Sequence, residues 1–367
     1  MAIPKALQRI IRPSILDLDA YTPSNAIETV AESLDISIDD VIKLDTNENP
    51  YGTTLRVQEA LASYDRYHRY PDPDQRVARE RVAAYAGASF DRIIIGNGAD
   101  ELIDLILLAT LDPGDEVIVP IPTFGVYAQR PPLFNGVTRL VNRLPDFELD
   151  LDAIDAAITD RTKVIFIASP NNPTGNLVSQ QQLVHVLRSG ALVVVDEAYF
   201  EFATKTLLPF TTEFDNMVIL RTFSKWSGLA GMRVGYGIFP LSLASQLWKV
   251  KQPFNVSVAG LKSVEAVLDD VDFLQDSVRR IRVERGRLYR SLRKLNFLQP
   301  FPSQGNYILC QVTRGDAHMI QRRLARLGIL IRQYSSPDLR DYLRITVGKP
   351  EETDVLIAAL HALAEEV

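Results

Sequence analysis

Short apolar runs alternate with segments of helical periodicity through the middle of the chain. The apolar runs have lengths typical of buried strands and lie at 93–95, 117–120, 137–141, 164–168, 192–195, 218–220 and 234–238. Segments with helical spacing separate them at 99–111, 151–158 and 179–188. Strands that are apolar throughout and alternate with helices are typical of a mostly parallel sheet covered by helices on both faces. The last two runs leave little room for a crossover helix, so one antiparallel strand is expected.

The pattern changes after Pro240. The expected elements there are helices at 241–271 and 273–295, a strand at 307–312, a helix at 317–327, strands at 329–332 and 342–346, and a helix at 351–364. This order predicts a smaller α+β domain. We therefore expect three parts: an N-terminal arm (1–45) that packs on the small domain, a large domain (46–260) and a small C-terminal domain (261–367).

Composition limits the possible partners. The net charge of −6 provides no basic field that would attract nucleic acid. Cys310 is the single cysteine, which excludes an internal disulfide and a cysteine-based metal site, and no metal is expected. No apolar run reaches the length of a membrane span, and residues 1–15 lack a long apolar segment. We therefore expect a cytoplasmic protein with no membrane partner.

A glycine-rich turn, GNGADE (96–101), follows the run at 93–95 and precedes a helical segment. Glycines at such a turn allow backbone N–H groups to approach an anion at the helix N-terminus. A dinucleotide-binding fingerprint is not matched, because Glu101 stands where close packing requires glycine. A phosphate cradle of another kind and an ordinary tight turn both remain open.

Three further segments place polar or aromatic residues directly after apolar runs. PTF (122–124) ends on an aromatic ring, SPNNPTG (169–175) presents two asparagines on a rigid turn, and Asp196 ends the run VVVD. Open α/β sheets bind ligands at the carboxyl ends of their strands. Asp196 is interpreted as the partner of a cation, since no histidine is near in sequence. An exposed acid at a strand end is the alternative.

Lys225 lies in RTFSKWSGLAGMR (221–233), just after the apolar run 217–220. A lysine amine that is kept from full solvation loses its proton more readily and becomes a nucleophile that can form a Schiff base. A loop lysine with its ammonium group in water is the alternative. With the phosphate cradle, the asparagines and Asp196, the lysine completes the set of groups that pyridoxal 5′-phosphate (PLP) requires.

At this point the chain resembles the fold-type-I PLP-dependent aminotransferases. The motifs that carry the resemblance run in family order: NENPYG (47–52), RYPD (69–72), GNGADE (96–101), PTF (122–124), SPNNPTG (169–175), VVVDEAY (193–199), RTFSKWSGLAGMRVGYG (221–237) and LRITVG (343–348). Within this group the chain is most similar to the histidinol-phosphate aminotransferases. The resemblance implies a PLP-transferase fold and transamination between histidinol phosphate and 2-oxoglutarate, which is a step in histidine biosynthesis.

The resemblance also implies how PLP would be held. Lys225 would bind the cofactor and move the proton, Asp196 would pair with its ring nitrogen, and Phe124 would stack on the ring. Tyr199 and Asn172 would hydrogen bond its phenolic oxygen. The phosphate ligands would be the turn at Gly98, the N–H groups of Ala99 and Asp100, and the side chains of Thr222, Ser224 and Arg233. Tyr51 would reach the phosphate of the partner subunit, which implies a homodimer with a shared active site.

The substrate would be bound by another group of residues. The resemblance implies that Arg344 would bind the carboxylate of the amino donor or keto acid. Arg332 would help to bind the phosphate of histidinol phosphate. Asn306 lies near the carboxylate site, and Tyr21 in the arm covers the substrate. Each arginine, considered alone, is also compatible with an exposed surface position.

Four other functions are weighed against this one. An aromatic amino-acid aminotransferase and a threonine-phosphate decarboxylase share the fold and the cofactor, so the motifs do not separate them from the first interpretation. A PLP-binding regulator would need a basic DNA-binding module, and the chain has no spare domain of that kind. A nicotinamide-dependent dehydrogenase does not fit Glu101.

Overall fold

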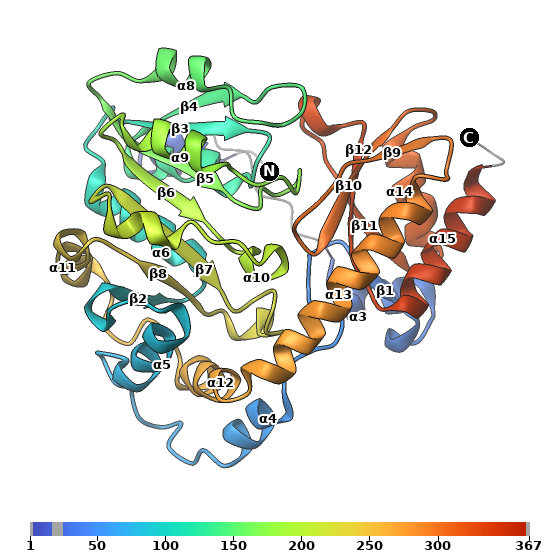
Figure 1. Ribbon diagram of the computed structural model, residues 1–367, viewed down its shortest axis with the longest axis horizontal. Helices are drawn as coiled ribbons and strands as arrows, with labels where there is room; N and C mark the ends of the chain where they lie inside the picture. The colour runs from blue at the N-terminus through green and yellow to red at the C-terminus, as the bar shows by residue number, and fades with distance from the viewer. Residues whose placement is uncertain (1–2, 17–24, 365–367) are drawn as a thin grey trace.

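The computed structural model describes residues 3–16 and 25–364, and within these ranges it contains a large and a small β-sheet (Figure 1). The large sheet has seven strands, which in spatial order are β2 (Ile93–Gly96), β8 (Gly235–Ile238), β7 (Met217–Thr222), β6 (Leu192–Asp196), β5 (Thr162–Ala168), β3 (Glu116–Ile121) and β4 (Val137–Asn142). β8 is antiparallel to both of its neighbours, and the remaining pairs in this sheet are parallel. The mostly parallel sheet with an antiparallel member, predicted from the apolar runs, is confirmed.

The central strands of the large sheet are apolar because both faces are covered, whereas the edge strand β4 is mostly exposed. In β6, Val193 and Val195 enter one hydrophobic cluster, whereas Val194 enters the other. This division follows from the alternation of side chains along a strand. One cluster includes residues of α6 (Ala99–Thr110) and α11 (Leu241–Val250). The other includes residues of α5 (Arg76–Ala86), α8 (Leu151–Ala157), α9 (Gln180–Leu187) and α12 (Val258–Leu268).

The small sheet combines strands from both ends of the chain. Its order is β1 (Ile42–Leu44), β11 (Ile329–Gln333), β12 (Tyr342–Thr346), β10 (Tyr307–Val312) and β9 (Leu298–Pro300). The helices beside it in Figure 1 are α13 (Val271–Leu292), α14 (Ala317–Arg326) and α15 (Pro350–Ala364). β1 pairs in parallel with β11, so the segment before the large sheet belongs to the small sheet. The expected boundaries at 45/46 and 260/261 stay predictions, and the second falls inside α12.

One predicted helix is wrong. The expected helix 241–271 is interrupted, because α11 ends at Val250 and α12 begins at Val258. Pro253 lies in the interruption and cannot donate a helical backbone hydrogen bond. The new helix is then capped by Ser257, whose hydroxyl accepts a hydrogen bond from the Gly260 N–H at 3.1 Å.

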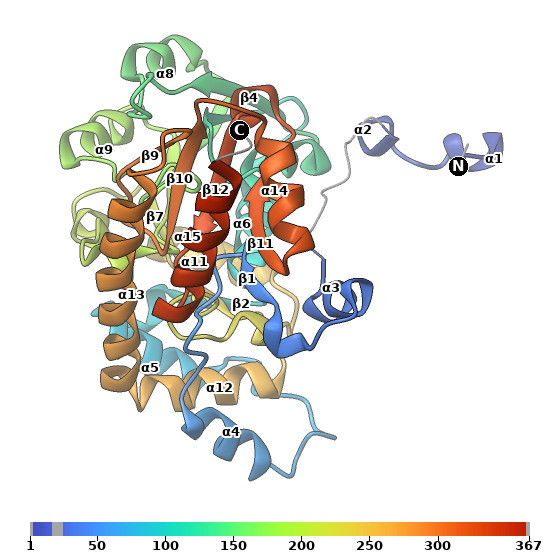
Figure 2. The same cartoon turned by 90° about the vertical axis from the view of Figure 1, so that its right-hand side faces the viewer.

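The other α-helices of the described ranges have four to eight residues each. They are α1 (Lys5–Gln8), α2 (Pro13–Leu16), α3 (Ile27–Leu34), α4 (Leu55–Ala62), α7 (Val126–Gln129) and α10 (Phe200–Ala203). Figure 2 shows α1 and α2 to one side of the two sheets. Arg12 connects this segment to the large domain by donating a hydrogen bond to the Leu133 carbonyl at 2.8 Å. Val30 and Ala31 of α3 pack with Leu330 of β11, so residues 27–34 contact the small sheet.

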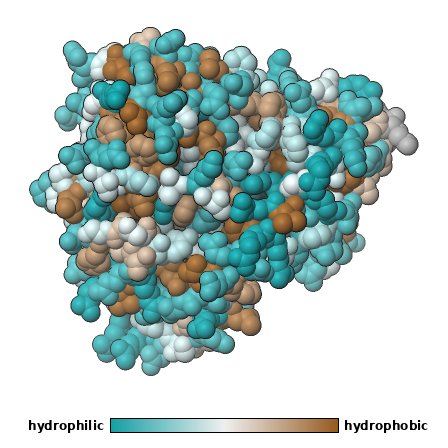
Figure 3. All heavy atoms as spheres, viewed as in Figure 1, coloured by the Kyte–Doolittle hydropathy of each residue, from teal (hydrophilic) through white to brown (hydrophobic). Residues whose placement is uncertain are grey.

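The surface of the molecule is mostly hydrophilic on the face drawn in Figure 3, where hydrophobic residues form small separate patches. Among residues 3–16 and 25–364, no helix has both the length and the apolar character that spanning a membrane requires.

Candidate active site

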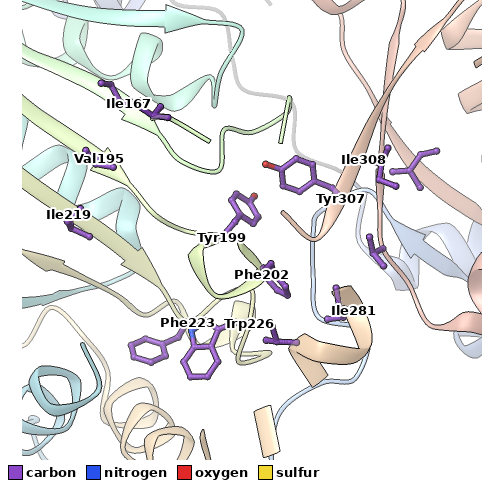
Figure 4. Close-up of a cluster of buried hydrophobic side chains, with 14 of the residues drawn as sticks. Ile167, Val195, Tyr199, Phe202, Ile219, Phe223, Trp226, Ile281, Tyr307 and Ile308 are labelled. Carbon is purple, nitrogen blue, oxygen red and sulfur yellow. The ribbon is translucent and has the colours of Figure 1, made fainter. Parts of the chain in front are cut away.

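The candidate residues gather at the carboxyl edge of the large sheet, on the side that faces the small sheet. Ala168 of β5 pairs with Asp196 of β6, and Asp196 pairs with Leu220 of β7. The segments that follow these three strands therefore leave the sheet at the same level. Figure 4 shows Tyr199, which follows β6, and Tyr307 of β10 lying between the two sheets. Their rings meet edge to face at 5.0 Å.

Asp196 is buried, and both of its carboxylate oxygens accept hydrogen bonds. Oδ1 accepts from the Ala198 N–H at 2.8 Å, and Oδ2 accepts from the Tyr127 hydroxyl at 2.5 Å. Removal from water raises the pKa of Asp196 to about 6, while the two hydrogen bonds act in the opposite direction. The carboxylate is therefore ionised at neutral pH and can accept a further hydrogen bond from a cationic N–H group.

Lys225 is partly buried, and its amine donates a hydrogen bond to the Thr46 carbonyl at 2.9 Å. Its pKa is lowered to about 8, mainly because the amine is removed from water and next because Arg344 is nearby. A substantial fraction of the amine is then neutral at slightly alkaline pH. This is the condition under which a lysine acts as a nucleophile or as a base.

A small polar cradle lies beside the lysine. Gly98 caps α6 with a φ of 79°, and a Cβ atom there would lie 2.8 Å from Nη2 of Arg233. Ser224 accepts a hydrogen bond from the Thr222 hydroxyl at 3.0 Å and one from Nη1 of Arg233 at 3.5 Å. The guanidinium also pairs with Asp100 at 3.2 Å. Two hydroxyls, a guanidinium and a helix N-terminus thus converge, as phosphate binding requires.

Backbone packing explains why small residues surround this cradle. A Cβ atom at Gly235 would lie 2.5 Å from the Ala99 nitrogen, so the strand next to the helix N-terminus must lack a side chain at this position. The close approach keeps the N-terminus of α6 beside the segment that carries Thr222 and Ser224. The residues predicted from GNGADE and RTFSK are therefore neighbours in space.

Arg344 lies opposite this cradle, on β12 of the small sheet. It is buried and donates hydrogen bonds to Oδ1 of Asn172 at 2.7 Å and to the Asp45 carbonyl. Its Nε–H group has no hydrogen-bond partner among residues 3–16 and 25–364. A buried guanidinium with an unused donor can bind an anion such as a carboxylate. Asn306 is also buried. Its Nδ2 group donates a hydrogen bond to the Asn47 carbonyl at 3.0 Å, and its Oδ1 accepts none from the part of the chain that the structure describes.

Tyr199 points its hydroxyl into the same region. The hydroxyl accepts a hydrogen bond from Nδ2 of Asn47 at 3.0 Å. Burial raises the pKa of Tyr199 to about 12, against the opposing effect of Arg344. The phenol is therefore protonated at neutral pH and can donate a hydrogen bond to a ligand.

Three other predicted residues, Phe124, Tyr51 and Arg332, belong to other segments of the chain. Phe124 meets Tyr127 edge to face at 5.6 Å. The ring of Tyr51 has Arg280 at 5.7 Å and Lys349 at 6.0 Å from its centroid. Arg332 is half-buried on β11. Tyr21 lies outside the described residues.

Two residues in the site were not predicted from the sequence. Asn47 lies in the NENPYG motif but received no role, although its side chain and backbone contact Tyr199, Thr346 and Asn306. Tyr127 follows the PTF motif by three residues, and its contact with Asp196 joins segments far apart in sequence. A motif shows that a residue is present in a loop, but such long-range contacts appear only in the folded chain.

Known proteins resemble this chain in sequence and in fold. The family model described as "Aminotransferase class I and II" matches residues 39–360. The chain is 43% identical over 353 residues to "Histidinol-phosphate aminotransferase 1, chloroplastic" of Arabidopsis thaliana, covering 95% of this chain and 85% of the relative. It is 42% identical over 359 residues to a histidinol-phosphate aminotransferase of Dehalococcoides mccartyi, covering 98% of this chain and 99% of the relative.

Solved structures have the same fold. A histidinol-phosphate aminotransferase from Sinorhizobium meliloti, in complex with pyridoxal-5′-phosphate, superposes with a TM-score of 0.86 at 26% identity, covering 97% of this chain and 98% of that one. An L-threonine-O-3-phosphate decarboxylase from Porphyromonas gingivalis superposes with a TM-score of 0.79 at 21% identity, covering 89% of this chain and 100% of that one. The second likeness concerns the fold alone.

Proposed function

The chain belongs to the aminotransferase class I and II family, and from this premise we propose that it uses PLP to exchange an amino group between histidinol phosphate and 2-oxoglutarate. The observation that carries the proposal is the amine of Lys225, which is partly buried with its pKa lowered to about 8, in the segment that follows β7. Asp196, a buried carboxylate, ends the neighbouring strand β6. This combination fits a lysine that binds PLP and an acid that pairs with its ring nitrogen.

The residues present fit PLP at each end of the cofactor. Gly98, Thr222, Ser224 and Arg233 form the cradle for its phosphate, and a side chain at position 98 would fill that cradle. Asp196 would accept the hydrogen bond from the ring nitrogen. When it is bound, PLP supplies an electron sink that allows proton removal from the carbon bearing the amino group.

Residues of this chain would then control the proton and the substrate. Nζ of Lys225, in its neutral form, would take the proton from that carbon and deliver it to C4′ of the cofactor. The hydroxyl of Tyr199 and the amide of Asn172 would hydrogen bond the cofactor's phenolic oxygen. Phe124 would stack on the ring and help to exclude water.

The arrangement of two arginines supports a substrate with strong negative charge. Arg332 and Arg344 are direct partners in the antiparallel pair of β11 and β12, so their side chains lie on the same face of the small sheet. Like charges directly opposite each other in a sheet are unfavourable, and an anion bound by both arginines would offset this repulsion. Histidinol phosphate carries a phosphate where glutamate carries its α-carboxylate, so one arginine pair would serve both substrates of the exchange. Asn306 and Tyr21 would complete this region.

A homodimer is part of the proposal. Tyr51 would contribute its hydroxyl to the phosphate site of the partner subunit, and its own surroundings include Arg280 and Lys349. Hybrid dimers of a Tyr51→Ala chain and a Lys225→Ala chain test this arrangement. Each hybrid contains one site in which both residues are intact, so mixing two impaired variants should restore activity. No gain on mixing would count against a shared site.

The substrate assignment is tested by an assay panel. Histidinol phosphate, phenylalanine and threonine phosphate are each offered with 2-oxoglutarate, and glutamate and carbon dioxide are measured. We expect glutamate formation to be fastest with histidinol phosphate and to be lost in Lys225→Ala. Faster turnover of phenylalanine would favour an aromatic aminotransferase, and carbon dioxide from threonine phosphate would favour the decarboxylase.

The place of the reaction in the cell stays a prediction. Relatives from plants carry the word "chloroplastic" in their names, whereas those from Dehalococcoides mccartyi do not. We propose a cytoplasmic enzyme of histidine biosynthesis, by analogy with the bacterial relatives.

A further inference from the structure

Tyr127 joins two parts of the proposed cofactor site that lie on different elements. It is in the short helix α7, which follows the loop that carries Phe124. Its hydroxyl donates to Oδ2 of Asp196, 69 residues further along the chain. Its ring stacks in parallel on Phe166 at 5.0 Å and meets Phe124 edge to face at 5.6 Å. One side chain therefore contacts both the acid and the aromatic residue that would face the PLP ring.

Packing alone does not account for a tyrosine at this position. Tyr127 is 1% exposed and sits among Val119, Phe166 and other apolar residues of one hydrophobic cluster. A phenylalanine would fill the same space without the cost of burying a hydroxyl group. The hydroxyl is retained in a water-excluded position, where its hydrogen bond is to the Asp196 carboxylate. Hydrogen bonds to an ionised group are stronger than those between neutral groups.

We propose that Tyr127 is a positioning residue, whose hydroxyl fixes the orientation of the Asp196 carboxylate toward the cofactor's ring nitrogen while its ring supports Phe124. The proposal rests on the proposed use of PLP. It assigns Tyr127 no contact with the reacting atoms. The Ala198 N–H anchors the other carboxylate oxygen, so the two hydrogen bonds together restrict rotation of the carboxylate about its bond to Cβ.

The charges around Asp196 make the tyrosine more important. Asp100 on α6 and the adjacent Glu197 both disfavour the ionised carboxylate, and Tyr199 also lies within electrostatic range. Tyr127 opposes this effect by donating a hydrogen bond to the anion. Its own pKa is raised well above the usual value, mainly by burial, so the hydroxyl remains a donor. Loss of the hydroxyl is therefore expected to make Asp196 harder to ionise.

Tyr127→Phe tests the proposal, with Tyr236→Phe as a matched control. Tyr236 is equally buried and also has a hydrogen-bonded hydroxyl, but its partner is Arg221 at 3.4 Å. The first measurement follows the Asp196 carboxyl by carbon-13 NMR in aspartate-labelled protein without PLP, with assignment by Asp196→Asn. We expect the carboxyl to titrate at higher pH in Tyr127→Phe, by about one unit, and to be unchanged in the control.

The second measurement is the PLP affinity of the same proteins after removal of the cofactor. We expect Tyr127→Phe to weaken binding by about tenfold at pH 6.5 and less at pH 8.5, where Asp196 is ionised in both proteins. Tyr236→Phe should change the affinity less than about twofold at both pH values. Thermal unfolding of each protein without PLP checks that the fold is kept.

Two results would overturn the inference. One is an unchanged Asp196 titration in Tyr127→Phe, and the other is a loss of affinity that is equal at both pH values and equal in the control. If the wild-type protein binds no PLP, the proposed function fails and the role of Tyr127 toward the cofactor fails with it. The NMR titration separates the two cases, since it measures the Tyr127–Asp196 contact without the cofactor.

Discussion

Removal of the Arg332 charge should discriminate between the two substrates of the proposed exchange. Arg332 and Arg344 are opposite each other in the pairing of β11 and β12. Histidinol phosphate brings up to two negative charges to this pair, whereas the α-carboxylate of glutamate brings one. Arg332→Gln should therefore impair the reaction with histidinol phosphate more than the reaction with glutamate.

The size of the effect follows from the burial of each arginine. A hydrogen bond to a charged group contributes about 1.5–3 kcal/mol, and the half-buried Arg332 belongs at the lower end of this range. That value corresponds to a loss of about tenfold in kcat/KM for histidinol phosphate. For glutamate, whose single charge would be bound mainly by Arg344, we expect a smaller loss of about two- to threefold. Arg344 is buried and donates to Asn172 and Asp45, so Arg344→Gln should reduce both by about a hundredfold.

The assay measures each half of the exchange separately. The enzyme loaded with PLP is mixed with histidinol phosphate or with glutamate, and the change in cofactor absorbance is followed at increasing donor concentration. Arg340→Gln is the control, since its side chain is 72% exposed and pairs with Asp341 on the surface. Equal losses for both donors in Arg332→Gln, or the same loss in Arg340→Gln, would refute the assignment of Arg332 to the phosphate.

Three further predictions concern the core of the site. Lys225→Ala should lower kcat by more than about a thousandfold, and activity within tenfold of wild type would contradict the proposed role of the amine. Glu197→Gln should lower the free energy of unfolding by about 3–5 kcal/mol in urea titrations, because it removes the carboxylate that pairs with the buried Arg221 guanidinium at 2.8 Å. As a control, Asp276→Asn removes an exposed carboxylate and should change the free energy of unfolding by less than about 0.5 kcal/mol. Asp196→Asn should stabilise the protein without PLP at pH 7.5 by up to about 3 kcal/mol. The reason is that folding raises the pKa of Asp196 from 3.8 to about 6, so the wild-type protein loses stability as the pH rises from about 4 to about 6. The gain should nearly vanish at pH 4, and an equal gain at both pH values would show that the carboxylate is not the cause.

Much of the large sheet could be predicted from the sequence, because its central strands are buried on both faces. A run such as Val193 to Val195 is apolar at every position, which is typical of a strand that packs on both faces. The position of Asp196 at the end of the run followed directly. The small sheet was harder to predict, since the strand Ile42–Leu44 is only three residues long and its partner β11 begins at Ile329.

Contacts between distant segments could not be predicted from local patterns. The break between α11 and α12 has a local cause in Pro253, and the helical spacing on both sides concealed it. The hydrogen bond from Tyr127 to Asp196 has no local signal, because each residue also fits an ordinary position in its own segment. Spacing in sequence indicates which residues share an element, whereas the partner of a buried hydroxyl depends on how the elements pack.

The loop 45–49 explains why the small sheet and the proposed cofactor site would act together. This loop continues from β1 of the small sheet, and its carbonyl groups accept hydrogen bonds from Lys225 at Thr46 and from Arg344 at Asp45. A ligand that takes over one of these donated hydrogen bonds replaces a contact that the protein already makes, whereas the Nε–H group of Arg344, which has no partner among the described residues, can bind without such an exchange. Such an exchange gives a small net free energy for a neutral ligand and a larger one for an anion, because the new bond is charge-assisted on both sides. The loop therefore favours anionic substrates over neutral ones, because an anion compensates better for the hydrogen bonds that the Thr46 and Asp45 carbonyls lose.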